Sequence, residues 1–156
     1  MVRLTDLHAA EAQHMRARAA AMQPVEPAPW ITPKPLTEAK VAIVSTAGLH
    51  RRDDAPFAVG GVDYRILPRD VVFKDVVTSH ISTNFDRSAF QQDPNMWLPL
   101  ERLDEMAANG EIGAVSRWHY TFMGAQPSHE ALQPTAEEVG RLLAADDVDV
   151  ALLVPV

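Results

Sequence analysis

The sequence predicts an α/β protein in which a partly parallel sheet is flanked by helices and preceded by an N-terminal helical arm. Residues 41–44 and 148–154 are almost uninterrupted apolar runs, which are typical of strands covered on both faces. Residues 135–145 have a helical apolar period and lead directly into the second run. A helix that leads into an all-apolar strand is the pattern of a parallel α/β sheet.

The composition is that of one globular domain with an appendage. The 156 residues are 47% hydrophobic and 22% charged, with a net charge of -7, and no basic stripe favours nucleic acid or an anionic membrane as partner. No apolar run approaches the roughly 20 residues that span a bilayer, and the first residues lack a basic-then-apolar secretory pattern. Cysteine is absent, which excludes disulfides and thiolate sites within this sequence. We therefore expect a cytoplasmic protein.

Residues 1–35 predict an arm that is separate from a body formed by residues 36–156. Residues 4–22 are rich in strong helix formers, and five prolines between positions 24 and 35 then favour an extended tether. A lone helix on a tether needs a partner surface to be stable. We therefore expect the arm to clasp a second copy, so that the protein is a homo-oligomer.

The first half of the body predicts short strands. Gly60-Gly61 lies between two short runs and indicates a hairpin. In the following run, Val62, Tyr64 and Ile66 alternate with Asp63 and Arg65, which predicts a half-buried strand. Residues 76–81 predict another short strand.

The second half of the body predicts one long loop and two helices. Residues 82–98 have no clean period, and ordered loops of this length are commonly functional. The first helix, at 100–109, has Pro99 near its start and Asn109-Gly110 as its stop. For the second helix, Thr135-x-x-Glu138 predicts a capping box ahead of residues 137–145.

Small polar residues follow the first apolar run, in the turn Ser45-Thr46-Ala47-Gly48. The carboxyl ends of parallel strands form the ligand-binding side of such folds, so hydroxyls and backbone N–H groups there suit a polar or anionic ligand. The turn is not a P-loop, because no lysine follows at the required spacing. A plain tight turn explains the same residues equally well.

His80, Asp86 and His119 are the titratable candidates of the body. Together they suit a general acid/base pair or a metal site of oxygen and nitrogen ligands, although their spacing matches no established metal signature. The alternative is a histidine that bonds a backbone carbonyl and pins the loop. Asp93-Pro-Asn95 predicts a turn that leads into a helix.

Several segments, taken in order, resemble the selenoprotein B family of glycine, sarcosine, betaine and D-proline reductases. They are "VAIVSTAGLH", "YRILP", "SHISTNFD", "DPNMWLPLERLDEMAANGEIGAVSRWHYTFMG" and "VDVALLVPV". The resemblance runs from about Val41 to Val156 and leaves out the arm. The sequence departs from the family at Ala47, where a glycine is expected, and at 82–84, which is usually richer in glycine.

The resemblance implies reductive cleavage of a C–N bond in an amino acid or related amine, in which a dithiol is oxidised to a disulfide. Written in reverse, X–H and Y–H form an X–Y bond with a disulfide as acceptor. In this family a selenocysteine attacks the substrate carbon, and a partner subunit with a pyruvoyl group activates the amine. Other reductase subunits and a small amine substrate are thus the implied partners. The implied catalytic residues are His80, His119 and Asp86, and the implied substrate-binding residues are Ser45, Thr46, Gly48 and Asn95.

In the family, a strand like "VALLVPV" is followed by a loop that carries selenocysteine or cysteine. We therefore expect the nucleophile directly after Val156, and an inactive chain without it. We also expect Ser45, Thr46, His80, Asp86 and His119 to converge in one cleft beside Val156. The alternative is a non-catalytic binding or assembly subunit, which docks through the N-terminal helix and an exposed sheet edge.

Overall fold

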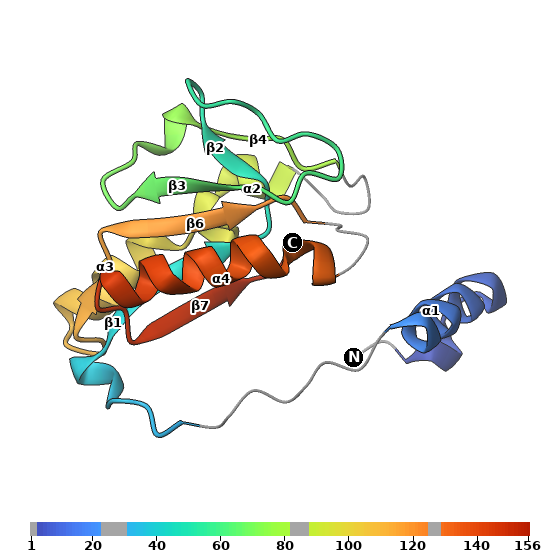
Figure 1. Cartoon of the computed structure of the whole chain (residues 1–156), viewed down its shortest axis with the longest axis horizontal. Coiled ribbons are helices and arrows are strands. Elements are labelled where there is room, and N and C mark those ends of the chain that lie inside the picture. Colours follow the sequence, from blue (N-terminus) through green and yellow to red (C-terminus); the bar gives the residue numbers. More distant parts are fainter. Residues whose placement is uncertain (1–2, 23–30, 82–87, 125–128) are drawn as a thin grey trace. The chain divides into compact units, whose positions relative to one another are not determined.

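The computed structural model describes residues 3–22, 31–81, 88–124 and 129–156. The chain divides into two compact units, residues 1–32 and residues 33–156. The second unit contains a mixed, mostly parallel sheet flanked by helices, and the first contains a helix (Figure 1). The predicted fold class is therefore confirmed.

The first unit consists of a short 3-10 helix, η1 (Leu4–Asp6), and the α-helix α1 (Ala9–Ala21). Alanine and long unbranched side chains explain why α1 is helical. Within α1 only Ala12 is buried. Its association with a second copy stays a prediction.

The central strand of the body is β1 (Lys40–Ser45), which pairs in parallel with β7 (Val150–Val154). Their register runs from Val41 opposite Val150 to Ser45 opposite Val154. The two apolar runs therefore lie side by side and in parallel, as the sequence predicts.

The other edge of β1 is shared by two short strands. The strand β5 (Ala114–Val115) pairs in parallel with the start of β1, and β6 (Trp118–Phe122) pairs in parallel with its end. Between them, residues 116–117 form a break in the ladder. Outside β6 lies β3 (Tyr64–Pro68), which is antiparallel to it.

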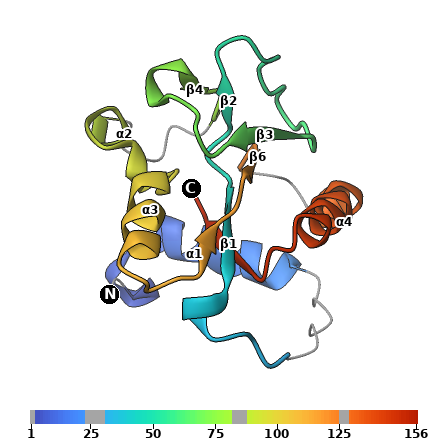
Figure 2. The same ribbon diagram turned by 90° about the vertical axis from the view of Figure 1, so that its left-hand side faces the viewer.

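One helix covers each face of the sheet: α3 (Leu100–Ala108) on one side and α4 (His129–Ala145) on the other (Figure 2). The apolar core on the α3 side contains Val41 and Ile43 together with Leu103, and the core on the α4 side contains Tyr120 and Val139. Because β1 is covered on both faces, it needs an apolar residue at nearly every position.

A small antiparallel sheet lies beside the main one and consists of β2 (Leu49–Arg51) and β4 (Val76–Thr78). The remaining elements are short: η2 (Leu36–Glu38), η3 (Phe73–Asp75), α2 (Ser88–Gln92) and η4 (Pro94–Met96). Thus two short helices occupy the second half of the segment predicted to be a long loop, and residues 82–87 lie outside the described residues.

The hairpin prediction at Gly60-Gly61 is wrong, although the turn itself exists. Gly60 has a φ of 71°, and the Ala58 carbonyl accepts a hydrogen bond from the Gly61 N–H. However, residues 52–63 contain no strand that could form the first arm of a hairpin, and β3 pairs with β6 instead. The half-buried strand predicted here is confirmed as β3, in which Tyr64 packs against Tyr120 and Phe122. Ile66 on the same face is 41% exposed, whereas Leu67 on the other face is fully buried.

The capping box at Thr135 is also wrong, because α4 starts at His129 and carries Pro134 inside it. The Thr135 hydroxyl donates to the Val62 carbonyl at 2.7 Å, and the Glu138 carboxylate accepts from the Tyr64 hydroxyl at 3.0 Å. Both side chains are therefore used to hold α4 against the segment around β3.

Gly113 lies close to the backbone that leads into β1, and a substitution there tests this close approach. A Cβ at this position would meet the Glu38 carbonyl carbon, with the Glu38 oxygen at 2.7 Å and the Ala39 nitrogen at 2.8 Å. Because these are backbone atoms, Gly113→Ala should lower the free energy of unfolding by about 1–3 kcal/mol, measured by urea denaturation.

Gly140→Ala is the matched control, since nothing lies within 4 Å of its Cβ position in exposed α4. It should raise stability by up to about 1 kcal/mol. Equal effects of the two substitutions would contradict the proposed close approach at Gly113.

Candidate functional site at the carboxyl edge of the sheet

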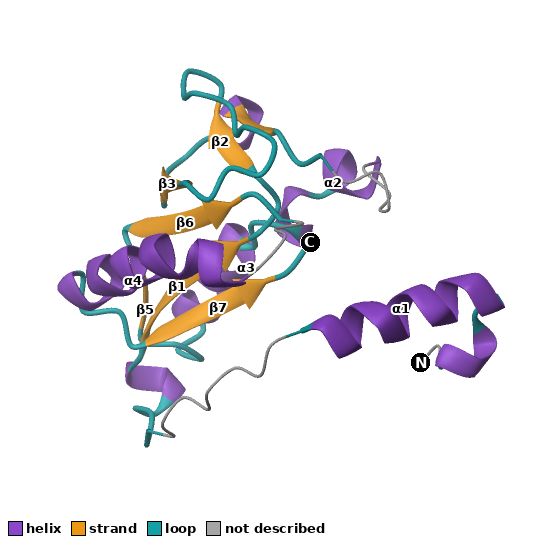
Figure 3. Ribbon diagram, turned by 45° about the vertical axis from the view of Figure 1, so that its right-hand side comes forward, coloured by secondary structure: helices purple, strands orange, loops and turns teal. Residues whose placement is uncertain are grey.

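The strands β1, β6 and β7 are parallel to one another and end on the same edge of the sheet (Figure 3). The helix α4 leads into β7, and α3 leads into β5, so both helices begin near this edge (Figure 1). Helix N-termini carry partial positive charge. The edge is thus the place where the fold gathers strand ends and helix starts, as in other α/β proteins that bind ligands.

Thr46 joins the ends of β1 and β7. Its Oγ1 accepts a hydrogen bond from the Val156 N–H at 2.8 Å and lies 3.4 Å from the Val156 carbonyl oxygen. The Thr46 N–H donates to the Val154 carbonyl at 3.0 Å. One residue therefore fixes the backbone direction at the end of β7.

Gly124, just after β6, lies against three polar atoms of this edge. A Cβ on Gly124 would lie 2.5 Å from His80 Nε2, 2.8 Å from the Thr46 carbonyl oxygen and 2.9 Å from the Val156 carbonyl oxygen. His80 itself is 4% exposed. The close approach shows that His80, Thr46 and Val156 meet around one glycine, which cannot be replaced without moving backbone.

Gly48 completes the arrangement from the opposite side of His80. It has a φ of 62°, and its Cβ position would lie 3.1 Å from the His80 nitrogen. A side chain here would be strained by the backbone conformation alone. We call Thr46, Gly48, His80, Gly124 and Val156 the edge cluster.

Two of the predicted substrate-binding residues, Ser45 and Asn95, make hydrogen bonds to neighbouring residues in the chain. Ser45 is fully buried, and its hydroxyl accepts from the Ala47 N–H at 3.3 Å, within the turn. The Asn95 side chain accepts from the Glu101 N–H at 3.2 Å and donates to the Asp93 and Glu101 carboxylates. Asn95 thereby caps the first turn of α3.

His119 is not brought to the edge cluster. It lies in β6 beside the middle of β1, where its Nδ1 accepts a hydrogen bond from the Ile43 N–H at 2.9 Å. The break between β5 and β6 leaves this N–H without a ladder partner, and the imidazole supplies one. His119 is therefore a structural residue of the sheet. The third predicted titratable group, Asp86, lies outside the described residues.

The His119 imidazole is held neutral. Burial lowers its pKa to about 4, helped by the nearby positive charge of Arg69 and opposed by Asp104. Since Nδ1 accepts from Ile43, Nε2 must carry the ring proton. Nε2 is buried without a hydrogen-bond partner among the described residues.

The structure adds polar residues that the sequence analysis did not single out. The Thr78 hydroxyl donates to the Ala47 carbonyl at 2.7 Å and accepts from the His80 N–H at 3.2 Å, so β4 positions His80. His50 bonds the Ser79 hydroxyl at 2.8 Å. The available signal was the Ser79-His80 pair, which directly follows a short β-branched run.

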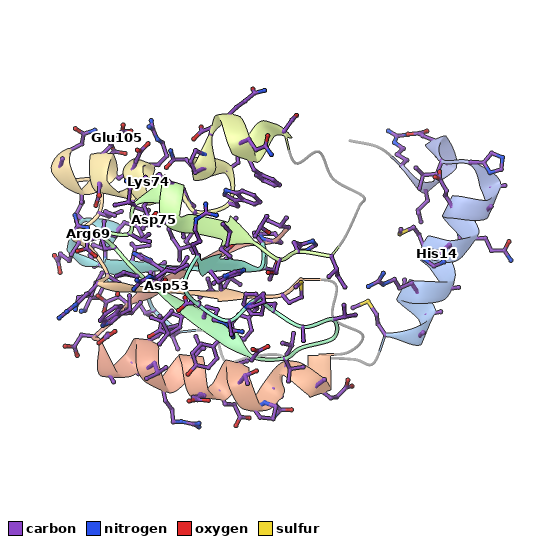
Figure 4. The ribbon with its side chains drawn as sticks, turned by 90° about the horizontal axis from the view of Figure 1, so that it is seen from above. His14, Asp53, Arg69, Lys74, Asp75 and Glu105 are labelled. Atoms are coloured by element: carbon purple, nitrogen blue, oxygen red, sulfur yellow. The ribbon has the colours of Figure 1, made fainter. Side chains whose placement is uncertain are left out.

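A cavity of about 580 Å³ lies between the small sheet and the α2–η4 segment. Its wall includes Leu49 and Thr78, which directly adjoin Gly48 and Ser79 in the chain. Lys74, labelled in Figure 4, also lines it. Phe90 and Trp97 stack in its outer wall with ring centroids 3.7 Å apart. The volume is within the range of small-molecule sites.

Other kinds of site are not found in the described ranges. No group of three histidine, cysteine, aspartate or glutamate side chains is placed to hold a metal ion there. Likewise, none of the helices within these ranges has both the length and the apolar character required to cross a membrane.

The fold and the edge cluster define an α/β protein with polar groups gathered where parallel strands end. The chain belongs to the glycine/sarcosine/betaine reductase selenoprotein B family, whose model matches residues 13–155. This membership supports a reductase-related role. Because the match begins inside α1, the expectation that the arm takes no part in the resemblance is wrong.

A similar curated protein is the D-proline reductase subunit gamma of Acetoanaerobium sticklandii. It is 31% identical over 134 residues, which cover 83% of this chain and 54% of that protein. The chain thus spans about half the length of this relative. No solved structure gives a significant match.

Thr46→Val should loosen the end of β7 while keeping the side-chain shape. Loss of the hydrogen bond from the Val156 N–H should cost about 1 kcal/mol and speed exchange of that amide hydrogen about fivefold. Thr46→Ser, which keeps the hydroxyl, should exchange like the unmodified protein. An unchanged rate in Thr46→Val would show that the contact contributes nothing.

The lowered pKa of His119 predicts how the free energy of unfolding depends on pH. Its folded pKa of about 4 lies below the ordinary value of 6.5, so the unfolded chain binds the proton more readily between these values. The free energy of unfolding should therefore fall as pH falls from 6.5 towards 4, by on the order of 3 kcal/mol. Urea denaturation over this range measures the slope.

His119→Asn is the control, because the Asn side-chain oxygen can accept from the Ile43 N–H but does not titrate. It should be less stable at neutral pH, because it leaves a cavity, and its stability should vary less with pH. An unchanged pH slope in this variant would exclude His119 as the cause.

Proposed function

We propose that this chain forms the substrate-cleft part of an amino-acid reductase. The reaction is reductive cleavage of a C–N bond in an amino acid or related amine, in which a dithiol is finally oxidised to a disulfide. The observation that carries the proposal is the meeting of Thr46, His80 and Gly124 with Val156 at the ligand edge, in a chain of this family.

The nucleophile of the reaction is proposed to be a selenocysteine, or a cysteine, that follows Val156. A low-pKa selenol supplies a strong nucleophile at neutral pH. The residues present fit such a group, because Thr46 holds the backbone N–H of Val156 and Gly124 leaves room beside its carbonyl.

The residues of this chain bind and orient the substrate. His80 lies at the edge, where its ring is suited to move a proton to the leaving nitrogen. The N-termini of α3 and α4 favour a substrate carboxylate. The cavity beside Leu49 and Thr78 has the volume to receive a small amine or amino acid.

Further partners are proposed from the family. The named relative is a subunit, which agrees with other reductase subunits as partners, and one of these would carry the pyruvoyl group that activates the amine. Self-association through the N-terminal arm and a cytoplasmic location remain predictions from the sequence.

A second candidate function is that of a non-catalytic assembly subunit. It is favoured by the outer strand β7, where Leu152 is 38% exposed and Leu153 is 69% exposed. Exposed apolar side chains on an edge strand suit a surface that another polypeptide covers.

The codon after Val156 separates the two functions. We expect an in-frame UGA followed by a continuing reading frame and an RNA hairpin. Another stop codon without continuation would support the assembly subunit.

The catalytic role of His80 is tested in the chain extended through that codon and combined with its partner subunits. His80→Gln should lower amine-dependent dithiol oxidation by about 100-fold or more, as expected for loss of a general acid. The control His14→Gln in the arm (Figure 4) should leave the rate unchanged. Equal rates for the two variants would remove His80 from the mechanism.

A further inference from the structure

A buried histidine outside the edge cluster holds a serine hydroxyl next to it. His50 in β2 is 5% exposed, and its Nε2 lies 2.8 Å from Ser79 Oγ. Its Nδ1 lies 2.7 Å from the Arg51 carbonyl oxygen. Both ring nitrogens are therefore engaged, and no step proposed above uses them.

The donor and acceptor in each of these two hydrogen bonds follow from the carbonyl of Arg51, which lies at one end of the series. A backbone carbonyl can only accept, so Nδ1 of His50 carries the ring proton. In the neutral ring Nε2 then has only a lone pair, and the Ser79 hydroxyl must donate its proton to it. Ser79 Oγ is left as an acceptor with free lone pairs. No donor from the described residues reaches it.

The position of Ser79 links this acceptor to the edge cluster. The Ser79 N–H donates to the Gly48 carbonyl at 2.9 Å, and His80 follows Ser79 directly. Pairing of His50 with Val77 places His50 and Ser79 on the same face of the small sheet. Ser79 is half-buried.

The surroundings of His50 argue against a serine nucleophile. In serine hydrolases a carboxylate stabilises the imidazolium that forms when the serine loses its proton. Here the partner of Nδ1 is a neutral carbonyl, and the ring packs edge-on against Phe57 with centroids 6.3 Å apart. The guanidinium of Arg65 lies 4.4 Å from the centre of the Phe57 ring, which adds positive charge nearby.

We propose that Ser79 Oγ accepts a hydrogen bond from the amine or ammonium N–H of the substrate, and that His50 is the positioning residue that keeps this hydroxyl an acceptor. The inference rests on the proposed function, since it concerns the nitrogen that the reductase would release. It adds a specificity rule: nitrogen groups that carry N–H are preferred over quaternary ones of the same shape and charge.

The test uses two ring cations of equal charge and needs no turnover. Pyrrolidinium carries two N–H groups, and N,N-dimethylpyrrolidinium carries two methyl groups in their place. Binding to the full chain is followed by NMR through the amide signals of Gly48, Ser79 and His80. Pyrrolidinium should bind about tenfold more tightly, as one charge-assisted hydrogen bond predicts. Long-range nitrogen–proton spectra should show the His50 ring proton on Nδ1.

Two variants test whether Ser79 and His50 cause the preference for the cation that carries N–H. Ser79→Ala should remove it by deleting the acceptor. His50→Phe should reduce it while Ser79 is still present, because the freed hydroxyl can then turn its proton towards the ligand. His14→Phe in α1 (Figure 4) should leave it unchanged.

Several results would overturn the proposal. They are equal binding of the two cations, no response of the Ser79 signal to either, a ring proton on Nε2, or covalent labelling of Ser79 by phenylmethanesulfonyl fluoride. Failure of the proposed function is distinguishable, because the N–H preference is measured without reduction. An active reductase without the preference would refute this inference alone.

Discussion

The register between β1 and β7 is the constraint on which the candidate site depends. At its start, the Asp149 carboxylate accepts from the Lys40 N–H at 2.9 Å, and the Lys40 ammonium donates to the Asp146 carbonyl. At its end, Thr46 holds Val156. A slip of one residue would turn every side chain of β7 to the other face and separate Thr46 from its partner. The polar contacts at both ends therefore fix the register of β1 and β7, which the apolar residues between them specify less strongly.

Sequence patterns predicted the elements that have a continuous apolar run or a local start signal. The apolar runs of β1 and β7 and the helix α3 were confirmed, because buried strands and a helix with Pro99 at its start have direct sequence signals. The start of α4 was missed because the helix begins at His129, six residues before Thr135. The Thr135 hydroxyl does not cap a first turn but contacts the carbonyls of Leu132 and of Val62, 73 residues away. Local capping chemistry cannot reveal a long-range partner.

The same distinction applies to the candidate site. The sequence suggested Thr46, Gly48 and His80 as candidates because they lie just after predicted strands, and strand ends gather at one edge. His119 was also predicted as a site residue. In the structure its Nδ1 accepts from the Ile43 N–H at the break between β5 and β6, and no sequence pattern predicts that break. His50 and Ser79 are 29 residues apart in the chain, and only the pairing of β2 with β4 brings them together.

The same β1–β7 pairing has a consequence for how the protein is made on the ribosome. Residues 41–45 of β1 pair with residues 109 positions later in the chain, so one edge of the central strand stays open until that segment has been synthesised. Closing such a long loop is slow relative to local helix formation. Over that interval the nascent chain exposes an unpaired apolar strand edge, a feature that favours aggregation until β7 pairs with it.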